Sequence, residues 1–519
     1  MSGSTRQGAE RRRSTARQEF AGAEFAGANF GILTGMDGHL PGFVGREAEL
    51  GRLEGWLGEV ARSGRGKAIA VRGRRAVGKS TLIEEFLVRE NPPHAFFAAS
   101  KDQPSTEAFA GFLSELQRST LPVAEELAAG VRPDSWEAAL RLIATSSASV
   151  GDSKTALPIC LVIDELPWLS EQEPSIEGLL QTAWDRYLSA VPMLLVLIGS
   201  DLHMMEELES YDRPLHGRVR GFVIEPLNPA EMNSMVRTDP ATALDAYCML
   251  GGFPQLAVTW RAKDTVRRYL ERELSEATSP LVVTGERVVA AELPPQSTPR
   301  AVIAAVGTGE RKFTKILHRS GVGRTSLSAA LQTLAQKRIV NRQVPFAGNQ
   351  TKLSRYTIAD PYLRFWLAFI APNLPLIERR RGDLVVERIM DDWSTFRGHA
   401  IEPIVRTSIE HMLPDERFGD ANFISAYWTR TNDPEVDLVG HAENRRPKSA
   451  AFLGSIKWRD TAPFSRQDGA ALAAVRTRVP LTGNATLLVG VSRNGFSPNA
   501  RLDIELGPEQ LLNAWSTRR

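Results

Sequence analysis

The chain has 519 residues, of which 42% are hydrophobic and 24% are charged, an ordinary composition for a soluble globular protein. This length predicts about three domains. The formal net charge of +2 is too small to indicate a nucleic acid or a membrane as partner of the whole chain.

The two cysteines, Cys160 and Cys248, stand in apolar runs. They exclude a disulfide framework and a cysteine metal cluster, and they indicate a reducing compartment. No apolar run reaches the roughly 18 residues of a membrane span, and no secretory signal is visible. We therefore expect a cytoplasmic protein with no membrane partner.

Residues 1–38 are rich in Gly, Ala, Ser and Arg. They contain three five-residue units, QEFAG, AEFAG and ANFGI, that resemble pentapeptide repeats. Three units are too few to bury a face, because solenoids need several stacked coils. We expect a disordered tail, and Met36 is a candidate alternative start.

The first landmark after the tail is FVGREAEL at residues 43–50, followed by an amphipathic helical pattern through Leu57. An apolar residue, a Gly turn and a charged helix start are also what an ordinary domain entry needs. Taken alone, this stretch leaves both interpretations open.

Residues 67–82, KAIAVRGRRAVGKSTL, have the order of strand, glycine-bounded loop and helix that a P-loop needs. Gly73 and Gly78 let the backbone curl, so that its N–H groups converge on phosphate oxygens at the positive end of the helix. Lys79 would neutralise the β- and γ-phosphates, and the Ser80 hydroxyl would coordinate Mg²⁺. The alternative is a Gly/Lys-rich turn that matches by chance. The candidate nucleotide-binding residues of the loop are Gly73, Arg74, Arg75, Ala76, Val77, Gly78, Lys79, Ser80 and Thr81.

Short apolar runs then alternate with helical patterns. The runs at 94–99, 159–163, 193–198 and 222–224 are typical of buried parallel strands, and helical patterns at 107–117, 136–145 and 176–188 separate them. This alternation predicts an α/β fold with the doubly wound parallel sheet of a P-loop NTPase.

Polar side chains follow two of these predicted strands. Asp164 and Glu165 stand where a Walker B element belongs, so that Asp164 would anchor Mg²⁺ through water and Glu165 would act as general base on the attacking water. The alternative is an acidic pair at a helix start. Ser200 is a candidate γ-phosphate sensor, and Arg218 is either a phosphate contact, in cis or in trans, or a surface arginine.

From residue 229 to about residue 281 the pattern is helical, with GGFPQLA at 251–257. Six motifs together resemble the archaeal-type ATPase family, which bacteria also carry. They are FVGREAEL, GRRAVGKS, CLVIDELPWL, IGSDLHMM, PLHGR and GGFPQLA. This family is similar to the STAND clade of AAA-like P-loop ATPases. The resemblance covers residues 43 to about 275. The family often has GRRRVGKT where this chain has GRRAVGKS, which keeps the Lys and the hydroxyl. The resemblance implies ATP and Mg²⁺ as cofactors, with Phe43, Gly45, Arg46 and the lid residue Pro254 close to the nucleotide.

Residues 296–355 contain eleven Lys and Arg residues against one acid, Glu310. The pattern of this segment predicts a winged helix-turn-helix, with residues 325–335 as its recognition helix. Its predicted helices are 301–306, 313–318 and 326–336, with a Gly-Val-Gly turn before the last, and its predicted strands are 339–344 and 353–358. Double-stranded DNA is then a candidate partner, while a solvated basic face or an internal lid is the alternative. The candidate DNA contacts are Arg324, Thr325, Ser326, Lys337 and Arg338. Residues 360–366, DPYLRFW, resemble the family's segment after the winged helix.

The last segment resembles a PD-(D/E)xK nuclease core, a domain that is frequently attached to these ATPases. Glu402 lies in a helical pattern, Asp437 in one strand and Lys457 in the next. Ser455 stands where the second acid belongs, and a hydroxyl is a poor replacement for a carboxylate ligand of Mg²⁺. We therefore expect a degenerate, structural nuclease-like domain rather than an active nuclease.

The sequence thus predicts an ATP-binding and hydrolysing molecular switch that couples nucleotide state to DNA or protein partners or to self-association. The alternatives are an ATP-gated DNA nuclease and a non-hydrolysing, nucleotide-dependent DNA-binding regulator. The predicted parts are a disordered tail, the ATPase domain, a helical lid, a winged helix and a nuclease-like domain, at residues 1–38, 39–228, 229–285, 286–375 and 376–519.

Overall fold

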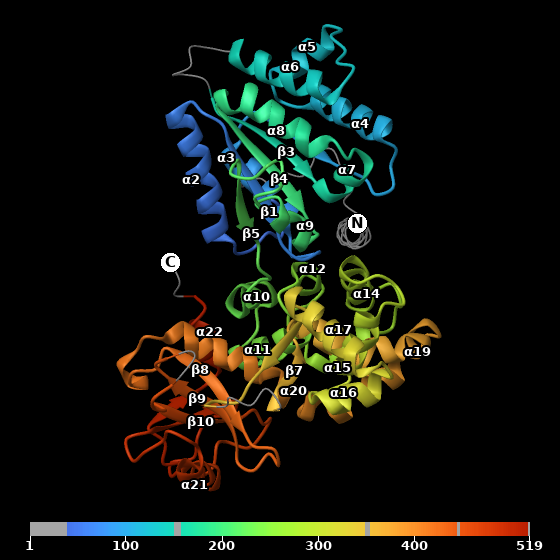
Figure 1. The fold of residues 1–519 in the computed structure, drawn as a ribbon. Helices are drawn as coiled ribbons and strands as arrows, with labels where there is room; N and C mark the ends of the chain where they lie inside the picture. The colour runs from blue at the N-terminus through green and yellow to red at the C-terminus, as the bar shows by residue number, and fades with distance from the viewer. Residues whose placement is uncertain (1–38, 150–156, 348–352, 444–446, 517–519) are drawn as a thin grey trace, which may run out of the picture. The chain divides into compact units, whose positions relative to one another are not determined.

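The computed structural model describes residues 39–149, 157–347, 353–443 and 447–516 (Figure 1). The predicted tail, its repeats and Met36 lie outside these residues. The chain divides into two compact units. Of the described residues, the first comprises 39–43, 56–69 and 83–198, and the second 44–55, 70–82 and 199–516, with the gaps given above. Among the described residues, no helix is both long enough and apolar enough to cross a membrane.

The first sheet has the strand order β2-β3-β4-β1-β5. Strand β3 pairs in parallel with β2 on one side and with β4 on the other. Both β3 and β4 are buried along their whole length, as strands covered by helices on two faces must be. The strands are β1 (Lys67–Arg72), β2 (His94–Ala98), β3 (Ile159–Asp164), β4 (Met193–Gly199) and β5 (Val219–Val223). The predicted α/β fold class is confirmed.

The helices of this part of the chain connect the strands or precede them. The predicted helices at 107–117, 136–145 and 176–188 are present, each with slightly different ends. The elements are α2 (Glu47–Ser63), α3 (Lys79–Glu90), α4 (Ser105–Arg118), α5 (Val123–Ala128), α6 (Trp136–Ser149), α7 (Leu166–Gln172), α8 (Ile176–Arg186), η1 (Leu188–Ala190) and α9 (Leu202–Glu207). Cys160 in β3 is buried and free, as the sequence predicts for both cysteines.

Five helices follow β5 in the second unit and form what is called here the helical segment. They are α10 (Pro229–Val236), α11 (Pro240–Leu250), α12 (Pro254–Ala257), α13 (Val266–Glu273) and α14 (Pro280–Glu292). Cys248 in α11 is buried and free. The GGFP stretch is where α11 ends, since Gly251 has φ +58° and Pro254 begins α12.

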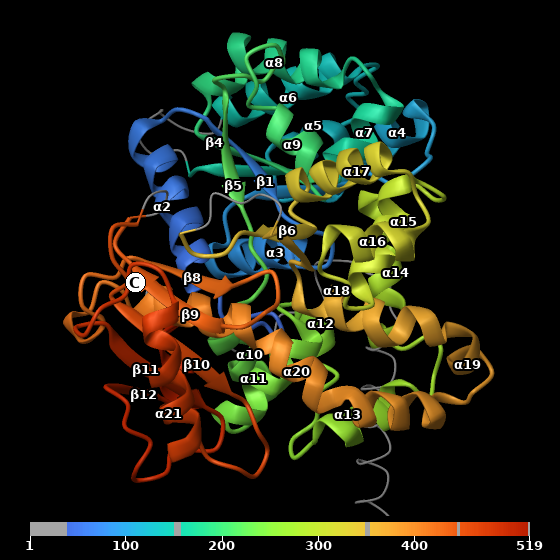
Figure 2. The ribbon, with the colours of Figure 1, turned by 60° about the horizontal axis from the view of Figure 1, so that its bottom comes forward.

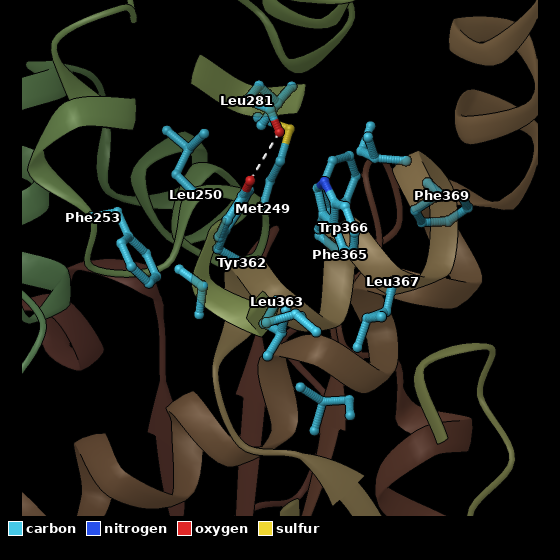
Figure 3. Close-up of a cluster of buried hydrophobic side chains, with 14 of the residues drawn as sticks. Met249, Leu250, Phe253, Leu281, Tyr362, Leu363, Phe365, Trp366, Leu367 and Phe369 are labelled. Carbon is cyan, nitrogen blue, oxygen red and sulfur yellow. Dashed lines mark hydrogen bonds between the residues drawn. The ribbon is translucent and has the colours of Figure 1, made fainter. Parts of the chain in front are cut away.

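Two aromatic residues of DPYLRFW, Tyr362 and Trp366, hydrogen-bond to the helical segment, and Figure 3 shows both beside Leu281. The Tyr362 hydroxyl donates to the Leu281 carbonyl over 2.9 Å, and the Trp366 indole N–H donates to the Val282 carbonyl over 2.8 Å. Both rings are buried in one apolar cluster with residues of α11, α12 and α14. These aromatic residues are therefore part of the hydrophobic core. They lie in α18 (Pro361–Phe365) and the π-helical turn η3 (Trp366–Ile370).

The basic segment forms three helices and a two-stranded antiparallel sheet, here called the basic module. Its elements are α15 (Thr298–Gly307), α16 (Phe313–Ser320), α17 (Arg324–Gln336), β6 (Val340–Gln343) and β7 (Arg355–Ile358). The order of elements is the one that the sequence predicts. Whether the module is a winged helix that binds DNA stays a prediction.

The C-terminal part has its own sheet, with the order β12-β11-β10-β9-β8, and the strands and α21 can be followed in Figure 2. The pairs β8–β9 and β9–β10 are antiparallel, whereas β10–β11 and β11–β12 are parallel. Its elements are η4 (Ala371–Asn373), α19 (Leu374–Glu378), α20 (Gly382–Met412), η5 (Glu416–Phe418), β8 (Phe423–Trp428), β9 (Glu435–His441), β10 (Phe452–Lys457), α21 (Arg466–Val475), η6 (Arg476–Arg478), β11 (Leu487–Ser492), β12 (Ile504–Leu506) and α22 (Pro508–Asn513).

Candidate functional site: the P-loop and its neighbours

The P-loop connects β1 to α3, and its two glycines have different physical roles. A Cβ on Gly73 would lie 2.4 Å from the carbonyl oxygen of Ile224, so only glycine permits this close approach of the backbones. Gly78 has φ +89°, a region that residues with a side chain rarely adopt. Ala76 has φ +68° without being glycine, which indicates a strained loop.

Lys79 is the first residue of α3, and its side chain turns back over the loop. Its Nζ donates to the carbonyls of Gly73 over 3.0 Å and Arg74 over 3.2 Å, and the residue is only 7% exposed. Ser80 and Thr81 follow in the first turn of α3. An ammonium beside a glycine-bounded loop and a helix N-terminus is the arrangement that attracts a phosphate.

Arg46, a predicted nucleotide contact, makes hydrogen bonds to other residues of the protein. Its guanidinium donates to the Val77 carbonyl over 3.0 Å and to the Glu49 carboxylate over 3.0 Å, and the residue is buried. Its backbone N–H donates to Glu231, which also caps α10. The FVGRE box therefore holds the P-loop and the start of the helical segment together.

The helical segment also contacts the P-loop through Pro254. The Cγ of Pro254 is 3.7 Å from the place where a Cβ on Gly78 would lie, so the first residue of α12 packs directly on the loop. Gly252 allows a second close approach, because its Cβ would lie 2.2 Å from the Leu227 carbonyl oxygen.

Arg74 joins the P-loop to the basic module. Its guanidinium lies 3.7 Å from the carboxylate of Asp360 and donates to the carbonyl of Arg338, just after α17. Asp360 is buried and caps α18 by accepting from the Leu363 N–H over 2.8 Å. Burial raises the pKa of Asp360, and the charge of Arg74 opposes that rise. Sequence reasoning missed Asp360, although its N-cap position before a Pro was a visible signal.

Lys337 and Arg338, two of the predicted DNA contacts, stand at this same end of α17. The Lys337 ammonium lies 3.5 Å from Glu292 of α14, and the Arg338 guanidinium lies 3.9 Å from Glu206 of α9. Arg324, Thr325 and Ser326 are exposed at the opposite, N-terminal end of α17. The predicted set is therefore divided between the two ends of one helix.

Three further exposed cations of the basic module lie in α16 and at the start of α17. Lys315 and Arg319 of α16 are exposed, and the Arg324 guanidinium lies over the Phe313 ring. The loop between β6 and β7, by contrast, is attached to the C-terminal sheet. The Phe346 N–H donates to Ala426 over 2.8 Å, and the Trp428 indole donates to Leu353 over 2.9 Å.

The predicted Walker B acids belong to the other unit. Asp164 ends β3 and is buried, and its carboxylate accepts the N–H of Glu165 over 2.8 Å. Glu165 caps α7 in the left-handed region, with φ +54°. In the same unit, burial and then the negative charge of Asp164 raise the pKa of Glu84 to about 7. Sequence reasoning missed Glu84, because a Glu within a helix gives no signal of such proximity.

Three further predicted nucleotide contacts, Phe43, Ser200 and Arg218, lie in different parts of the chain. Phe43 lies in the first unit, where the guanidinium of Arg89 is 5.9 Å from its ring centroid. Ser200 lies between β4 and α9 in the second unit. The Arg218 guanidinium donates to the carbonyls of Pro214 and His216 in its own loop.

The candidate nuclease residues are close together, but their carboxylates are engaged. Glu402 accepts from Arg406 over 2.9 Å and lies 3.0 Å from His399 Nδ1. Asp437 accepts from the Ile456 N–H over 2.8 Å and from the Ser455 hydroxyl over 3.3 Å. Among the described residues, no group of three His, Cys, Asp or Glu could hold a metal ion. These donors do not fit a Mg²⁺ site, because a guanidinium already neutralises one of the two acids.

The comparisons with known proteins agree with the fold. Residues 42–196 match the model of the AAA ATPase domain, and residues 366–470 match a family described as archaeal and bacterial proteins of unknown function. An uncharacterized protein of Methanocaldococcus jannaschii is 26% identical over 426 residues, which are 80% of this chain and 88% of the relative.

Solved structures also resemble the chain, with low identity. A Walker-type ATPase of Pyrococcus abyssi has a TM-score of 0.44 and 18% identity, covering 65% of this chain and 99% of that one. The ORC2 protein of Aeropyrum pernix, solved in ADPNP–ADP complexes, has a TM-score of 0.44 and 14% identity, covering 66% and 95%. From the two family models, the chain carries an AAA ATPase domain and, after it, a domain shared with archaeal and bacterial proteins of unknown function.

Proposed function

We propose that the chain is an ATP-hydrolysing molecular switch that transmits the state of its P-loop to the basic module. The carrying observation is the position of Arg74. One guanidinium of the phosphate-binding loop contacts both a buried carboxylate at the start of α18 and the backbone at the end of α17. A change of the loop on nucleotide exchange would therefore reach the end of the β6–β7 sheet where Val340 pairs with Ile358.

Binding would rest on the loop amides and Lys79. The ammonium is already held over the loop by two carbonyls, so a phosphate would replace neutral acceptors by a charged one, which strengthens its hydrogen bonds. Arg46 and Pro254, which pack on the loop, would fix its shape. We keep adenine as the base on the strength of the AAA ATPase domain match.

Hydrolysis would use Ser80 and Asp164 to hold Mg²⁺ and Glu165 to hold a proton of the attacking water. Both donors suit a hard cation, being a hydroxyl and a buried carboxylate. Bound Mg²⁺ would neutralise charge that develops on the phosphates. Ser200 and Arg218 are proposed sensors of the γ-phosphate.

The proposed output is contact of the basic module with double-stranded DNA. Exposed Lys315, Arg319 and Arg324 lie around an exposed helix start with small polar side chains. Such a cluster neutralises phosphates, while the polar side chains can reach bases. A nuclease function is not proposed, since the acids of the candidate nuclease site are engaged by protein donors.

The test is ATP turnover by the full chain, measured with and without duplex DNA. Wild type is expected to hydrolyse ATP, while Lys79→Ala loses nucleotide binding and Glu165→Gln binds ATP but turns it over at least ~100-fold more slowly. Tight ATP binding without turnover in wild type would replace hydrolysis by a purely conformational role. Turnover unaffected by both substitutions would overturn the proposal.

A further inference from the structure

Two arginines of the second unit, Arg311 and Arg364, are half-buried, and neither makes an ion pair within the described part of the chain. Arg311 precedes α16, and its carbonyl accepts the N–H of Tyr356 in β7 over 2.9 Å. Among the described residues its guanidinium makes no hydrogen bond and no ion pair. Arg364 of α18 donates to the carbonyl of His399 over 3.1 Å, and it makes no ion pair within the described part of the chain.

The acids nearest to these arginines are already engaged. Glu402 is bound by Arg406 and His399, as described above, and Asp437 is bound by the backbone of β10. Arg406 joins the Glu402 carboxylate to the backbone of β9, because its Nε also donates to the main-chain carbonyl of Asp437 over 3.2 Å. The cluster therefore contains more cations than anions. Its cations are Arg311, Arg364, Arg406 and Lys457, and its anions are Glu402, Asp437 and, near Arg406, Glu410.

The electrostatics of the cluster reflect this excess. Burial, and then the like charge of Arg311, lower the pKa of Arg364 to about 10. Burial also lowers the pKa of Arg311. Burial opposes ionisation of Glu402, but His399, Arg406 and Arg311 outweigh it and lower that pKa to about 2. Glu402 is thus fully ionised at neutral pH and contributes a single negative charge to the cluster.

The neighbouring charges do not remove the excess. Arg355 lies close to Arg311, but it is paired with Glu435 over 2.6 Å and held by Asn432. Keeping like charges together in a desolvated place is unfavourable unless a counter-charge neutralises them. An anion is the missing element of the cluster.

We infer that Arg311, Arg364, Arg406 and Lys457 form a metal-independent binding site for a phosphate group. Guanidinium forks present paired N–H donors that match phosphate oxygens, and Glu402 and His399 orient Arg406 without occupying the other cations. The site joins α18 and the start of α16 to α20, β9 and β10. The phosphate would belong to a nucleic-acid strand or to a small phosphorylated compound. This inference does not depend on the proposed ATPase activity.

The test uses the full-length chain in a Lys79→Ala background, so that the P-loop does not take up the probe. Inorganic phosphate and pyrophosphate are titrated by calorimetry and by their effect on the melting temperature. Arg311→Gln and Arg364→Gln are compared with Arg300→Gln, which removes a half-buried arginine paired with Glu286. Arg311→Lys and Arg364→Lys keep the charge without the guanidinium fork, and they are expected to bind pyrophosphate more tightly than the Gln variants and more weakly than the parent.

The expected result is a rise in melting temperature with pyrophosphate that Arg300→Gln retains. Each Gln variant should weaken binding about tenfold or more, the loss of one charge-assisted hydrogen bond or a pair of them. Without ligand these variants should be no less stable than the parent, because a like charge has been removed. A large loss of stability without ligand would make both arginines structural and overturn the inference, as would absence of phosphate binding in the parent.

A second arm identifies the source of the phosphate. Fluorescent single-stranded and duplex oligonucleotides are titrated in Arg324→Gln, which weakens the proposed duplex contact of α17. A further loss of affinity on adding Arg311→Gln supports a nucleic-acid backbone. Unchanged oligonucleotide affinity with lost pyrophosphate affinity supports a small phosphorylated ligand.

Discussion

At the scale of single residues, Gly73 and Gly51 are a matched pair. A Cβ on Gly73 would lie 2.4 Å from the Ile224 carbonyl oxygen, whereas a Cβ on Gly51 in α2 meets nothing within 4 Å. Gly73→Ala is expected to destabilise the fold by about 1–3 kcal/mol through overpacking and to weaken ATP binding. Gly51→Ala should stabilise it by up to about 1 kcal/mol. Denaturant midpoints and titration with a fluorescent nucleotide measure both, and equal effects of the two substitutions would contradict the loop geometry.

Glu85 of α3 gives a prediction about pH. Its side chain is fully buried, and it accepts from the Leu40 N–H, His39 and Arg89 at 2.7–2.8 Å. Burial opposes ionisation, but the Leu40 hydrogen bond, Arg89 and His39 together lower the pKa below 4.5. The stability contributed by the ionised Glu85 is therefore present above about pH 4.5 and is lost as the pH falls through the lower, folded-state pKa.

Glu85→Gln is expected to cost about 2 kcal/mol at pH 7 and to flatten the acid dependence of the denaturant midpoint. Glu90→Gln, at the exposed end of the same helix, is the control and should leave both unchanged. An acid dependence of the Glu85 variant equal to that of wild type would show that another carboxylate is responsible.

At the scale of elements, the contact between Arg74 and Asp360 links the P-loop to α17 and α18. Arg74→Gln and Asp360→Asn, alone and together, form a double-mutant cycle on the melting temperature and on ATP affinity. We expect a coupling energy of about 0.5–3 kcal/mol, the range for residues in contact. Arg300→Gln with Asp360→Asn is the uncoupled control. Strictly additive effects of the Arg74 and Asp360 substitutions would mean that this ion pair does not couple the P-loop to α17 and α18.

Most elements could be predicted from the sequence, because their signals are local. The apolar run before Asp164, the glycine-bounded loop before Lys79 and the kink at Pro254 each mark a boundary that the structure has within a few residues. The signals of Arg46, Glu84, Arg74 and Arg406 are not local. Their roles depend on what long-range folding brings beside them, such as Val77 for Arg46 or Asp164 for Glu84. Sequence patterns also did not reveal that the β6–β7 loop is attached to β8.

At the scale of the whole molecule, the second unit connects its parts through buried charges as well as apolar surface. Asp245 of α11 accepts from Arg397 over 2.9 Å, from the Trp458 indole over 2.7 Å and from Arg493 over 3.0 Å. A helix of the helical segment is thus tied to the strand ends of the C-terminal sheet, next to Lys457. Asp245→Asn is expected to destabilise the chain by about 1–3 kcal/mol, since it removes a charged hydrogen-bond acceptor while Asp460 stays paired with Arg397 over 2.8 Å. Hydrogen exchange should then increase at α11 and β10, and unchanged exchange would contradict a shared core.

The central claim is that the nucleotide on the P-loop sets the DNA affinity of the basic module. The most direct measurement is the affinity of Glu165→Gln for a duplex in the presence of ATP and of ADP. The account predicts that the two affinities differ by at least about fivefold, the lower end of typical coupling between sites. It also predicts that adding Asp360→Asn makes the DNA affinities with ATP and with ADP equal, while ATP still binds. Equal affinities with ATP and with ADP would contradict it.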